Sequence, residues 1–464
     1  MDMRCSVVIP CHNGVEWTAA CLQSLLSQTE PPDEILVVDN ASSDATPRLG
    51  EQFGPTVRVL RQPRNLGFAG GVNAGIRAAT GDELLIVNND TQAAPNLIAE
   101  LRRALHESPT IGAVAPVSNH VKGDAHLVIG DFAKDPQQRA ELAEELQQEP
   151  LLQDVDSLAG LCLMLRRSTL DEVGLFDERF GHGNYEDDDL SLRLRLHGYR
   201  LAVARRAFLH HEGHATFEAM GIDLAEEIEK RLGQFRAKWQ SHPAGLAVLA
   251  YLHYDLRIAA KAPEEARRRC PQWPDAHWHI GRYEERHGDP LVAIHHLQTF
   301  LRQCPEHVEA RLWLGTAQLA AGQIDAGTQT LQRALARHRP TKGQETRMLE
   351  RLGELSYERG QFAAALQHFY TATALMSDRN ELHNWRGLCL LQMDRLTDAR
   401  DAFARAIELD HALAHSHLGI CQHRLGEHDA AFQSFEKAVV LRPEDPVARA
   451  NYEIGVAARN AATC

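Results

Sequence analysis

The chain has 464 residues, of which 44% are hydrophobic and 24% are charged, an ordinary balance for a globular protein. This length exceeds one ordinary hydrophobic core and predicts two or three domains. The formal net charge is -14, and no long run of Lys or Arg occurs. Because nucleic-acid phosphates need clustered cations, no nucleic-acid partner is expected.

The sequence contains no apolar run of about 20 residues, so no membrane span is expected. Its first residues lead directly into a strand-like segment, without the pattern of a secretory signal. Nine cysteines occur without CxxC pairs, which indicates reduced thiols. We therefore expect a cytoplasmic protein, with the inner face of the membrane as a further possible location.

Short β-branched runs alternate with helical stretches in the first half of the chain. Such fully apolar strands predict an α/β domain whose mostly parallel sheet is covered by helices on both faces. Ligands bind beyond the carboxyl ends of such strands, where Asp39, Asn40 and Asp90 fall. The predicted strands are residues 6–10, 34–39, 57–60, 83–87 and 201–209, and the main predicted helices are 16–28 and 71–79.

The second half shows a repeated helical unit. A Gly recurs at intervals of 34, 38, 34 and 32 residues, with a small residue 12 positions later and a large apolar residue 4 positions after that. This period resembles the tetratricopeptide repeat over about 180 residues and predicts an all-α solenoid. The Gly positions are Gly281, Gly315, Gly353, Gly387 and Gly419.

These patterns predict three segments. A catalytic domain covers residues 1–243 and a helical linker covers 244–272. About five repeats and a capping helix fill residues 273–464.

Six motifs in the first half follow one another in a recognisable order. They are SVVIPCHNG at 6–14, VDNASSD at 38–44, RNLGFAGGVNAG at 64–75, NND at 88–90, FDERF at 176–180 and YEDDDL at 185–190. Together they resemble family 2 glycosyltransferases of the nucleotide-sugar-binding A-type fold, over roughly residues 4–217. The resemblance is specific for the reaction class and says little about the sugar.

Asp90 is the best candidate for a metal ligand. It follows a buried strand, and the resemblance places it in a D-x-D-like motif whose earlier positions are here Asn88 and Asn89. A divalent cation, Mn²⁺ or Mg²⁺, would offset the charge of a leaving diphosphate. The resemblance also implies a histidine beside the diphosphate that can act as a second metal ligand, and for this role we favour His210 over His211. The simpler alternatives are an Asx turn and a hydrogen-bonded histidine.

Further residues are assigned to the nucleotide-sugar, a UDP- or dTDP-sugar, by the resemblance. Asp39 fits a contact to the base or the ribose, whereas Asp44 is better explained as a helix N-cap. Glycines permit close approach of the backbone to a ligand. The assigned residues are Pro10, Asn13, Asp39, Asn65, Gly67, Gly71, Asn73, Asn89 and Asp90.

Four consecutive acids, 186–189, supply the candidate catalytic base. The resemblance assigns the base to Asp187, with Glu186 as the second choice. We expect Asp188 and Asp189 to cap a helix over 190–197, where the dipole favours negative charge. The alternative is a purely structural acidic cap.

These features predict a metal-dependent glycosyltransferase. Because only one base-like motif is visible, we expect a single displacement at the anomeric carbon, which inverts its configuration. Repeat arrays bind peptide segments, so we expect a protein or peptide acceptor such as flagellin, and the repeats could also mediate a homodimer. One alternative is a rhamnosyltransferase-like enzyme of surface polysaccharide assembly. An alternative of another class is a non-catalytic repeat scaffold.

Overall fold

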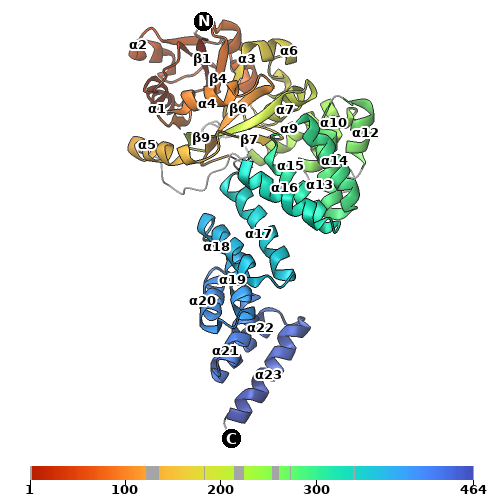
Figure 1. Ribbon diagram of the computed structural model, residues 1–464. Helices are drawn as coiled ribbons and strands as arrows, with labels where there is room; N and C mark the ends of the chain where they lie inside the picture. Colours follow the sequence, from red (N-terminus) through yellow and green to blue (C-terminus); the bar gives the residue numbers. More distant parts are fainter. Residues whose placement is uncertain are drawn as a thin grey trace. The chain divides into compact units, whose positions relative to one another are not determined.

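The computed structural model describes residues 3–121, 135–181, 183–213, 224–252, 261–271, 273–337 and 340–462. Its contacts divide the chain into two compact units, Met1–Trp313 and Leu314–Cys464. The first unit contains the α/β fold and several of the helices that follow it, and the second unit contains helices (Figure 1).

One nine-stranded sheet forms the centre of the first unit as far as the structure describes it. The order is β3-β2-β1-β4-β8-β6-β9-β5, and β7 also pairs with β9. The strands are β1 (Cys5–Cys11), β2 (Glu34–Asp39), β3 (Val57–Arg61), β4 (Glu83–Val87), β5 (Thr91–Ala93), β6 (Ile111–Ser118), β7 (Leu152–Val155), β8 (Cys162–Arg166) and β9 (Arg200–His211).

The sheet is mixed, whereas the sequence predicted a mostly parallel one. Strands β3, β2, β1 and β4 are parallel, as expected. Strand β8 is antiparallel to both of its neighbours, β4 and β6, and β5 and β7 are antiparallel to β9. A fully buried apolar run has the same composition in either direction, so the pattern of β8 could not reveal its orientation.

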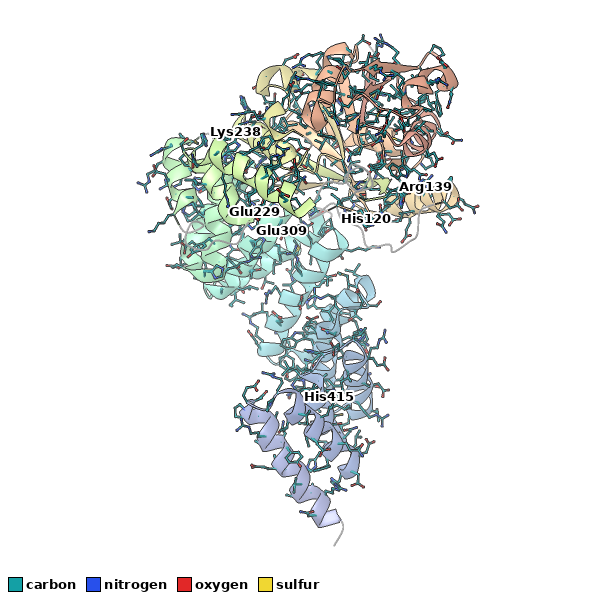
Figure 2. The ribbon with its side chains drawn as sticks, turned by 180° about the vertical axis from the view of Figure 1, so that it is seen from behind. His120, Arg139, Glu229, Lys238, Glu309 and His415 are labelled. Atoms are coloured by element: carbon teal, nitrogen blue, oxygen red, sulfur yellow. The ribbon has the colours of Figure 1, made fainter. Side chains whose placement is uncertain are left out.

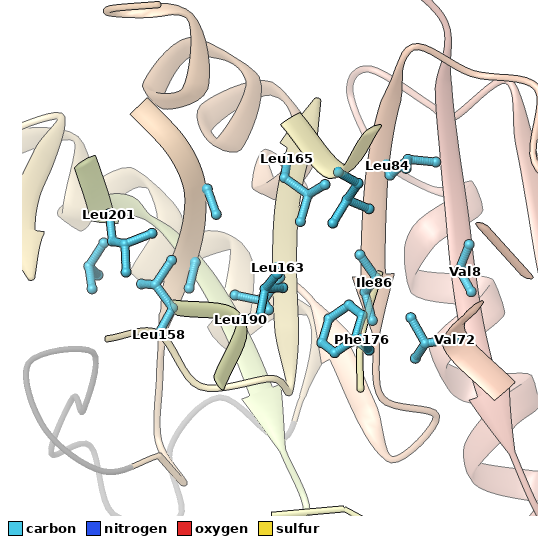
Figure 3. Packing of buried hydrophobic residues seen from close by; sticks show 14 of the residues in the cluster. Val8, Val72, Leu84, Ile86, Leu158, Leu163, Leu165, Phe176, Leu190 and Leu201 are labelled. Atoms are coloured by element: carbon cyan, nitrogen blue, oxygen red, sulfur yellow. The ribbon is translucent and has the colours of Figure 1, made fainter. Parts of the chain in front are cut away.

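Two hydrophobic cores cover the two faces of the sheet, because successive strand residues point to opposite sides. Val8, Leu84 and Ile86 face one core, together with Val72 of α3 (Gly67–Ala78) (Figure 3). Leu85 lies in the other core, with buried side chains of α1 (Val15–Leu26) and α4 (Leu97–His106). Burying each such aliphatic side chain contributes about 1.5–3 kcal/mol. These cores fix the strand ends from which the candidate site is built.

The remaining helices of the first unit surround the sheet and continue beyond it. They are η1 (Thr46–Arg48), α2 (Leu49–Phe53), α5 (Pro136–Glu145), η3 (Leu146–Gln148), α6 (Arg167–Val173), η4 (Glu178–Phe180), α7 (Glu186–Leu196), α9 (Leu224–Trp239), α10 (Pro243–Leu252), α12 (Ala262–Arg269), α13 (Asp275–His287) and α14 (Pro290–Gln303).

The compact first unit extends to residue 313, past the predicted boundaries at 243 and 272. A buried cluster explains the difference, since it joins Phe180 and Leu192 to Phe235 and to Trp273. The predicted linker and the first repeat helix, α13, are therefore packed on the α/β fold.

The second unit consists of paired helices, as the repeat period predicted. Helix α15 (Val308–Ala320) crosses the boundary between the units. The others are α16 (Ile324–Arg337), α17 (Lys342–Glu358), α18 (Phe362–Leu375), α19 (Asn380–Gln392), α20 (Leu396–Glu408), α21 (Ala414–Arg424), α22 (His428–Leu441) and the terminal α23 (Pro446–Ala462).

The recurring glycines allow the two helices of a repeat to touch. A Cβ atom built on Gly387 would lie 2.4 Å from Cε1 of Phe403, and one on Gly419 would lie 2.5 Å from Cδ1 of Phe435. Both partners are the large apolar residues that recur 16 positions after the glycine. The repeated spacing of 16 residues thus corresponds to a contact between the two helices of each repeat.

We expect Gly387→Ala to lower the free energy of unfolding by about 1–3 kcal/mol, because the added methyl group overpacks this contact. Urea unfolding of the full-length protein, followed by circular dichroism, measures the change. Gly343→Ala is the matched control, since no atom lies within 4 Å of its added Cβ. Equal stability of the two variants would contradict the assigned helix contact.

Candidate active site

The loops after β1 and β2 are held together by side-chain hydrogen bonds. Asn13 accepts a hydrogen bond from the backbone N–H of Ser43 at 2.9 Å, and its own N–H donates to Oγ of Ser42 at 2.8 Å. Asp44 accepts from the N–H groups of Val15, at the start of α1, and of Thr46. Asp44 thus binds the first N–H of η1 and the first N–H of α1, although the N-cap positions of these helices are Ala45 and Gly14.

Asp39 ends β2 and is fully buried. Its Oδ1 accepts a hydrogen bond from the N–H of Ser42 at 2.8 Å, whereas Oδ2 has no hydrogen-bond partner among the described residues. Nε of Arg61 lies 3.9 Å from Oδ2. A carboxylate oxygen with spare accepting capacity at this strand end can receive a hydrogen bond from a ribose hydroxyl or a base N–H.

The glycine-rich segment at residues 64–75 packs closely against neighbouring parts of the chain. A Cβ on Gly71 would approach Nδ2 of Asn40 to 2.8 Å and Cβ of Pro10 to 3.3 Å. Gly67 has φ +75°, and a Cβ there would lie 2.1 Å from the carbonyl oxygen of Gly181. The backbone at 67 thus lies directly against the loop that precedes α7.

Three predicted nucleotide-sugar residues have internal partners. Asn65 accepts from the N–H of Gly67 at 2.8 Å. Asn73 is buried and exchanges hydrogen bonds with the backbone of Phe176, at 2.9 and 3.1 Å. The side chain of Asn89 donates to Oγ1 of Thr18 on α1 at 3.0 Å. These amides fix the loops and helices around the site.

Asp90 lies where β4 gives way to β5, and it faces a histidine. Nε2 of His211 is 3.4 Å from Oδ1 of Asp90. His210 has the opposite orientation, because side chains alternate along β9, and its Nε2 lies 3.3 Å from Oε1 of Glu212. The preference for His210 as the histidine facing Asp90 is thus corrected to His211. His214, in the same motif, lies outside the described residues.

The end of β6 fixes the orientation of His211. Asn119 accepts from the backbone N–H of His211 at 2.8 Å and donates to its carbonyl oxygen at 3.0 Å. Nδ1 of the ring lies 2.9 Å from the carbonyl oxygen of His120, which can only accept, so Nδ1 carries a proton. The sequence contained a signal for Asn119 and His120, since polar residues follow the apolar run 111–117 in the same way as they follow the strand before Asp90.

This geometry fits a divalent cation. With Nδ1 protonated, the Nε2 lone pair of neutral His211 faces the carboxylate of Asp90, and two acceptors repel each other unless a proton or a cation lies between them. Burial lowers the pKa of His211, but Asp90, the carbonyl group of His120 and the charge of Glu212 together leave that pKa raised. No group of three or more His, Cys, Asp or Glu side chains in the described ranges is arranged to hold a metal. Phosphate oxygens and water would complete the coordination of an ion held by these two residues.

Helix α7 brings the acidic motif to the same end of the sheet. The N–H of Asn88 donates to the carbonyl oxygen of Leu161 at 2.9 Å, and the N–H of the adjacent Gly160 donates to Oδ2 of Asp187 at 2.8 Å. Oδ1 of Asp187 accepts from the N–H of Asp188 at 2.9 Å. Gly160, which the motifs did not single out, therefore links the ends of β4 and β8 to the candidate base.

Asp187 and Glu186 have different electrostatic environments. Burial raises the pKa of Asp187, but two backbone N–H groups favour its ionised form. Burial, and then the charge of Asp187, raise the pKa of Glu186 well above its ordinary value. Two backbone N–H groups thus stabilise the carboxylate form of Asp187, whereas the pKa of Glu186 is raised further by the neighbouring charge of Asp187.

Helix α7 begins at Glu186, four residues before the predicted start. All four acids consequently lie in its first turn. Asp189 is not a cap, because it is buried in contacts with Arg193 and with α9. Favourable interaction with the helix dipole still applies to the whole turn.

Comparisons with known proteins agree with this arrangement. The model of glycosyl transferase family 2 matches residues 6–174, and the tetratricopeptide repeat model matches 280–342, 314–378, 350–410 and 386–446. The N-acetylglucosaminyl-diphospho-decaprenol L-rhamnosyltransferase of Mycobacterium tuberculosis is 34% identical over 223 residues, covering 42% of this chain and 72% of that protein. The succinoglycan biosynthesis protein ExoO of Rhizobium meliloti is 34% identical over 113 residues, or 24% of this chain and 32% of that protein.

A solved structure of GalNAc-T7 with UDP, GalNAc and Mn²⁺ gives a TM-score of 0.37 at 19% identity, over 45% of this chain and 44% of that chain. Among the helices of the described ranges, none is both long and apolar enough to cross a membrane. The order of the motifs, their convergence at one end of the sheet and the 72% coverage of the rhamnosyltransferase lead to one conclusion. The chain belongs to glycosyl transferase family 2 and carries tetratricopeptide repeats in its C-terminal part.

Proposed function

We propose that this glycosyltransferase is inverting and metal-dependent, and that it moves a sugar from a nucleotide-sugar to an acceptor hydroxyl. The observation that carries the proposal is the position of Asp187, whose carboxylate accepts two backbone hydrogen bonds at the strand ends that also hold Asp39 and the Asp90–His211 pair. A carboxylate that can take a proton thus lies at the same end of the sheet as the residues suited to a nucleoside diphosphate.

The reaction follows from these residues. The acceptor oxygen attacks the anomeric carbon as Asp187 takes its proton, and the bond between that carbon and the diphosphate oxygen breaks. A single displacement inverts the configuration. A cation bound at Asp90 and His211 would supply counter-charge to the leaving diphosphate. Glu186, kept neutral, cannot accept the proton.

The acceptor is proposed to be a polypeptide bound by the repeats. In the second unit, a cavity of about 280 Å³ is lined by Arg386, Tyr370 and Arg395, among others. The guanidinium of Arg386 lies 4.1 Å from the ring centroid of Tyr370, and its Nε has no hydrogen-bond partner among the described residues. Arg395, in contrast, is paired with Asp398 at 2.6 Å. The cavity is therefore suited to a carboxylate of a bound polypeptide.

A second candidate is rhamnosyl transfer in polysaccharide assembly. It is favoured by the relatives, whose names describe rhamnosyl transfer and succinoglycan biosynthesis. Offering dTDP-rhamnose with either polypeptide or diphospho-lipid-linked sugar acceptors separates the two candidates. A non-catalytic scaffold would hydrolyse no nucleotide-sugar in the absence of an acceptor.

We expect Asp187→Asn to lower turnover by about 10²–10⁴-fold, because an amide cannot accept the hydroxyl proton. Nucleotide affinity, measured by calorimetry, should stay unchanged. Glu186→Gln is the matched control, since glutamine mimics a neutral glutamic acid and should retain most of the activity. The base assignment fails if the two variants lose equal activity.

We expect His211→Ala to weaken Mn²⁺-dependent nucleotide binding by about tenfold or more, because one of two protein ligands is lost. His210→Ala should leave that binding unchanged, since His210 faces away from Asp90. Calorimetric titration of UDP and dTDP with and without Mn²⁺ distinguishes the variants. Identical nucleotide affinity with and without Mn²⁺ in the unmodified protein would refute the metal role.

We expect Arg386→Ala to raise the KM for a polypeptide acceptor by about tenfold, the effect of losing a charge-assisted hydrogen bond. Hydrolysis of the nucleotide-sugar should not change, because the first unit carries the chemistry. Arg442→Ala is the control, since Arg442 pairs with Asp445 at 3.4 Å and does not line this cavity. An unchanged KM in Arg386→Ala would assign acceptor binding to another surface.

A further inference from the structure

Helix α9 packs on the start of α7, which carries the proposed base. The ring of Phe235 on α9 lies 5.8 Å from that of Tyr185, the residue directly before α7. Tyr185 has φ +68°, a conformation that a bulky residue adopts only when its surroundings hold it. Aromatic packing by α9 therefore supports the strained entry into the helix.

A buried carboxylate one turn into α7 ties the two helices together. Oδ1 of Asp189 accepts from Nε1 of Trp239 at 2.9 Å and from Nζ of Lys238 at 2.5 Å. Oδ2 accepts from Nε of Arg193 at 2.9 Å. Lys238, marked in Figure 2, also contacts Asp177 at 2.7 Å, so it joins α9 to the loop before η4 as well.

These contacts lie on the side of α7 opposite the base. An α-helix turns by about 100° per residue, so positions 187 and 189 point about 200° apart. Asp187 accordingly reaches Gly160 at the sheet, while Asp189 reaches α9. The contacts of Asp189 with α9 therefore hold Asp187, on the opposite side of α7, against the strand ends.

The far end of α7 is held by the first repeat helix. Arg195 donates from Nε to Oδ2 of Asp275 at 2.7 Å, and its Nη2 donates to Oδ1 of the same carboxylate. Nε1 of Trp273 donates to Asp275 as well, at 3.1 Å. Arg195 and Asp275 are 5% and 3% exposed, so the pair is a buried, bidentate connection to α13.

We propose that Lys238, Trp239 and Asp275 are positioning residues for the base Asp187, an inference that rests on the proposed function. All three lie after residue 174, where the match to the family model ends. They act through α7 and touch neither the donor nor the acceptor. The predicted linker and the first repeat thereby complete the catalytic geometry.

The test measures kcat and KM for hydrolysis of UDP- and dTDP-hexoses by the full-length protein. Lys238→Met should lower kcat by about 10–100-fold, the effect of displacing a catalytic group by about 1 Å, without changing KM. Lys238→Arg should restore kcat, because it keeps the charge and a donor to Asp189. Trp239→Phe should lower kcat in the same way, since it removes only the indole N–H contact to Asp189. Asp275→Asn should also lower kcat, because it breaks the buried bidentate pair with Arg195.

Lys230→Met is the matched control, since Lys230 lies on the same helix and pairs with Glu227 of that helix at 3.7 Å. Its kcat should equal that of the unmodified protein. The proposal is overturned if Lys238→Met and Trp239→Phe keep full kcat. It is also overturned if kcat, UDP affinity and the melting temperature fall together, which would indicate a general loss of structure. Full activity of Asp187→Asn would instead refute the proposed base, whatever the result at Lys238.

Discussion

Gathering four consecutive carboxylates in the first turn of one helix, with Glu186 and Asp189 buried, carries a large electrostatic cost, and the surrounding structure offsets it differently for different residues. Asp187 accepts hydrogen bonds from two backbone N–H groups, and the pKa of Glu186 is raised well above its ordinary value. Asp189 is neutralised by Lys238 and Arg193. Neighbouring carboxylates thus acquire different properties, and the need to supply partners for Asp187 and Asp189 accounts for the contacts of α7 with the strand ends and with α9.

The sequence predicted five of the nine strands that the structure describes, β1 to β4 and β9, and missed β5 to β8. The apolar runs of β1 to β4 and the repeat glycines were sufficient to predict these strands and the repeat helices. Both patterns arise from the burial of residues that are close together in the sequence. The reversed direction of β8 could not be predicted from an apolar run. The choice between His210 and His211 depended on the register of β9 against β5, which is set by residues more than a hundred positions away.

The predicted domain boundary illustrates a related limit. Sequence motifs show where one family pattern ends and another begins. The extent of a compact unit depends instead on side chains that make contacts across the predicted boundary. Asp275 lies in the predicted repeat domain, yet it forms a buried pair with Arg195 of α7. Single charged residues of this kind carry no period, so no repeat pattern could have assigned them to the first unit. The motif that supplied the base likewise gave no signal of the residues that support it.

The contact between Gly67 and Gly181 has a consequence for how this site can change over time. The two backbones lie so close that a Cβ on Gly67 would overlap the carbonyl group at 181, and a Cβ on Gly181 would approach Arg231 to 2.7 Å. The N–H of Phe68 also donates to that carbonyl oxygen at 2.8 Å. A side chain at position 67 therefore requires the two loops to separate, whereas one at position 181 requires the side chain of Arg231 on α9 to move. The loop that carries Gly67 and the loop before α7 therefore cannot change shape independently at this contact, and a substitution at position 67 would disturb both.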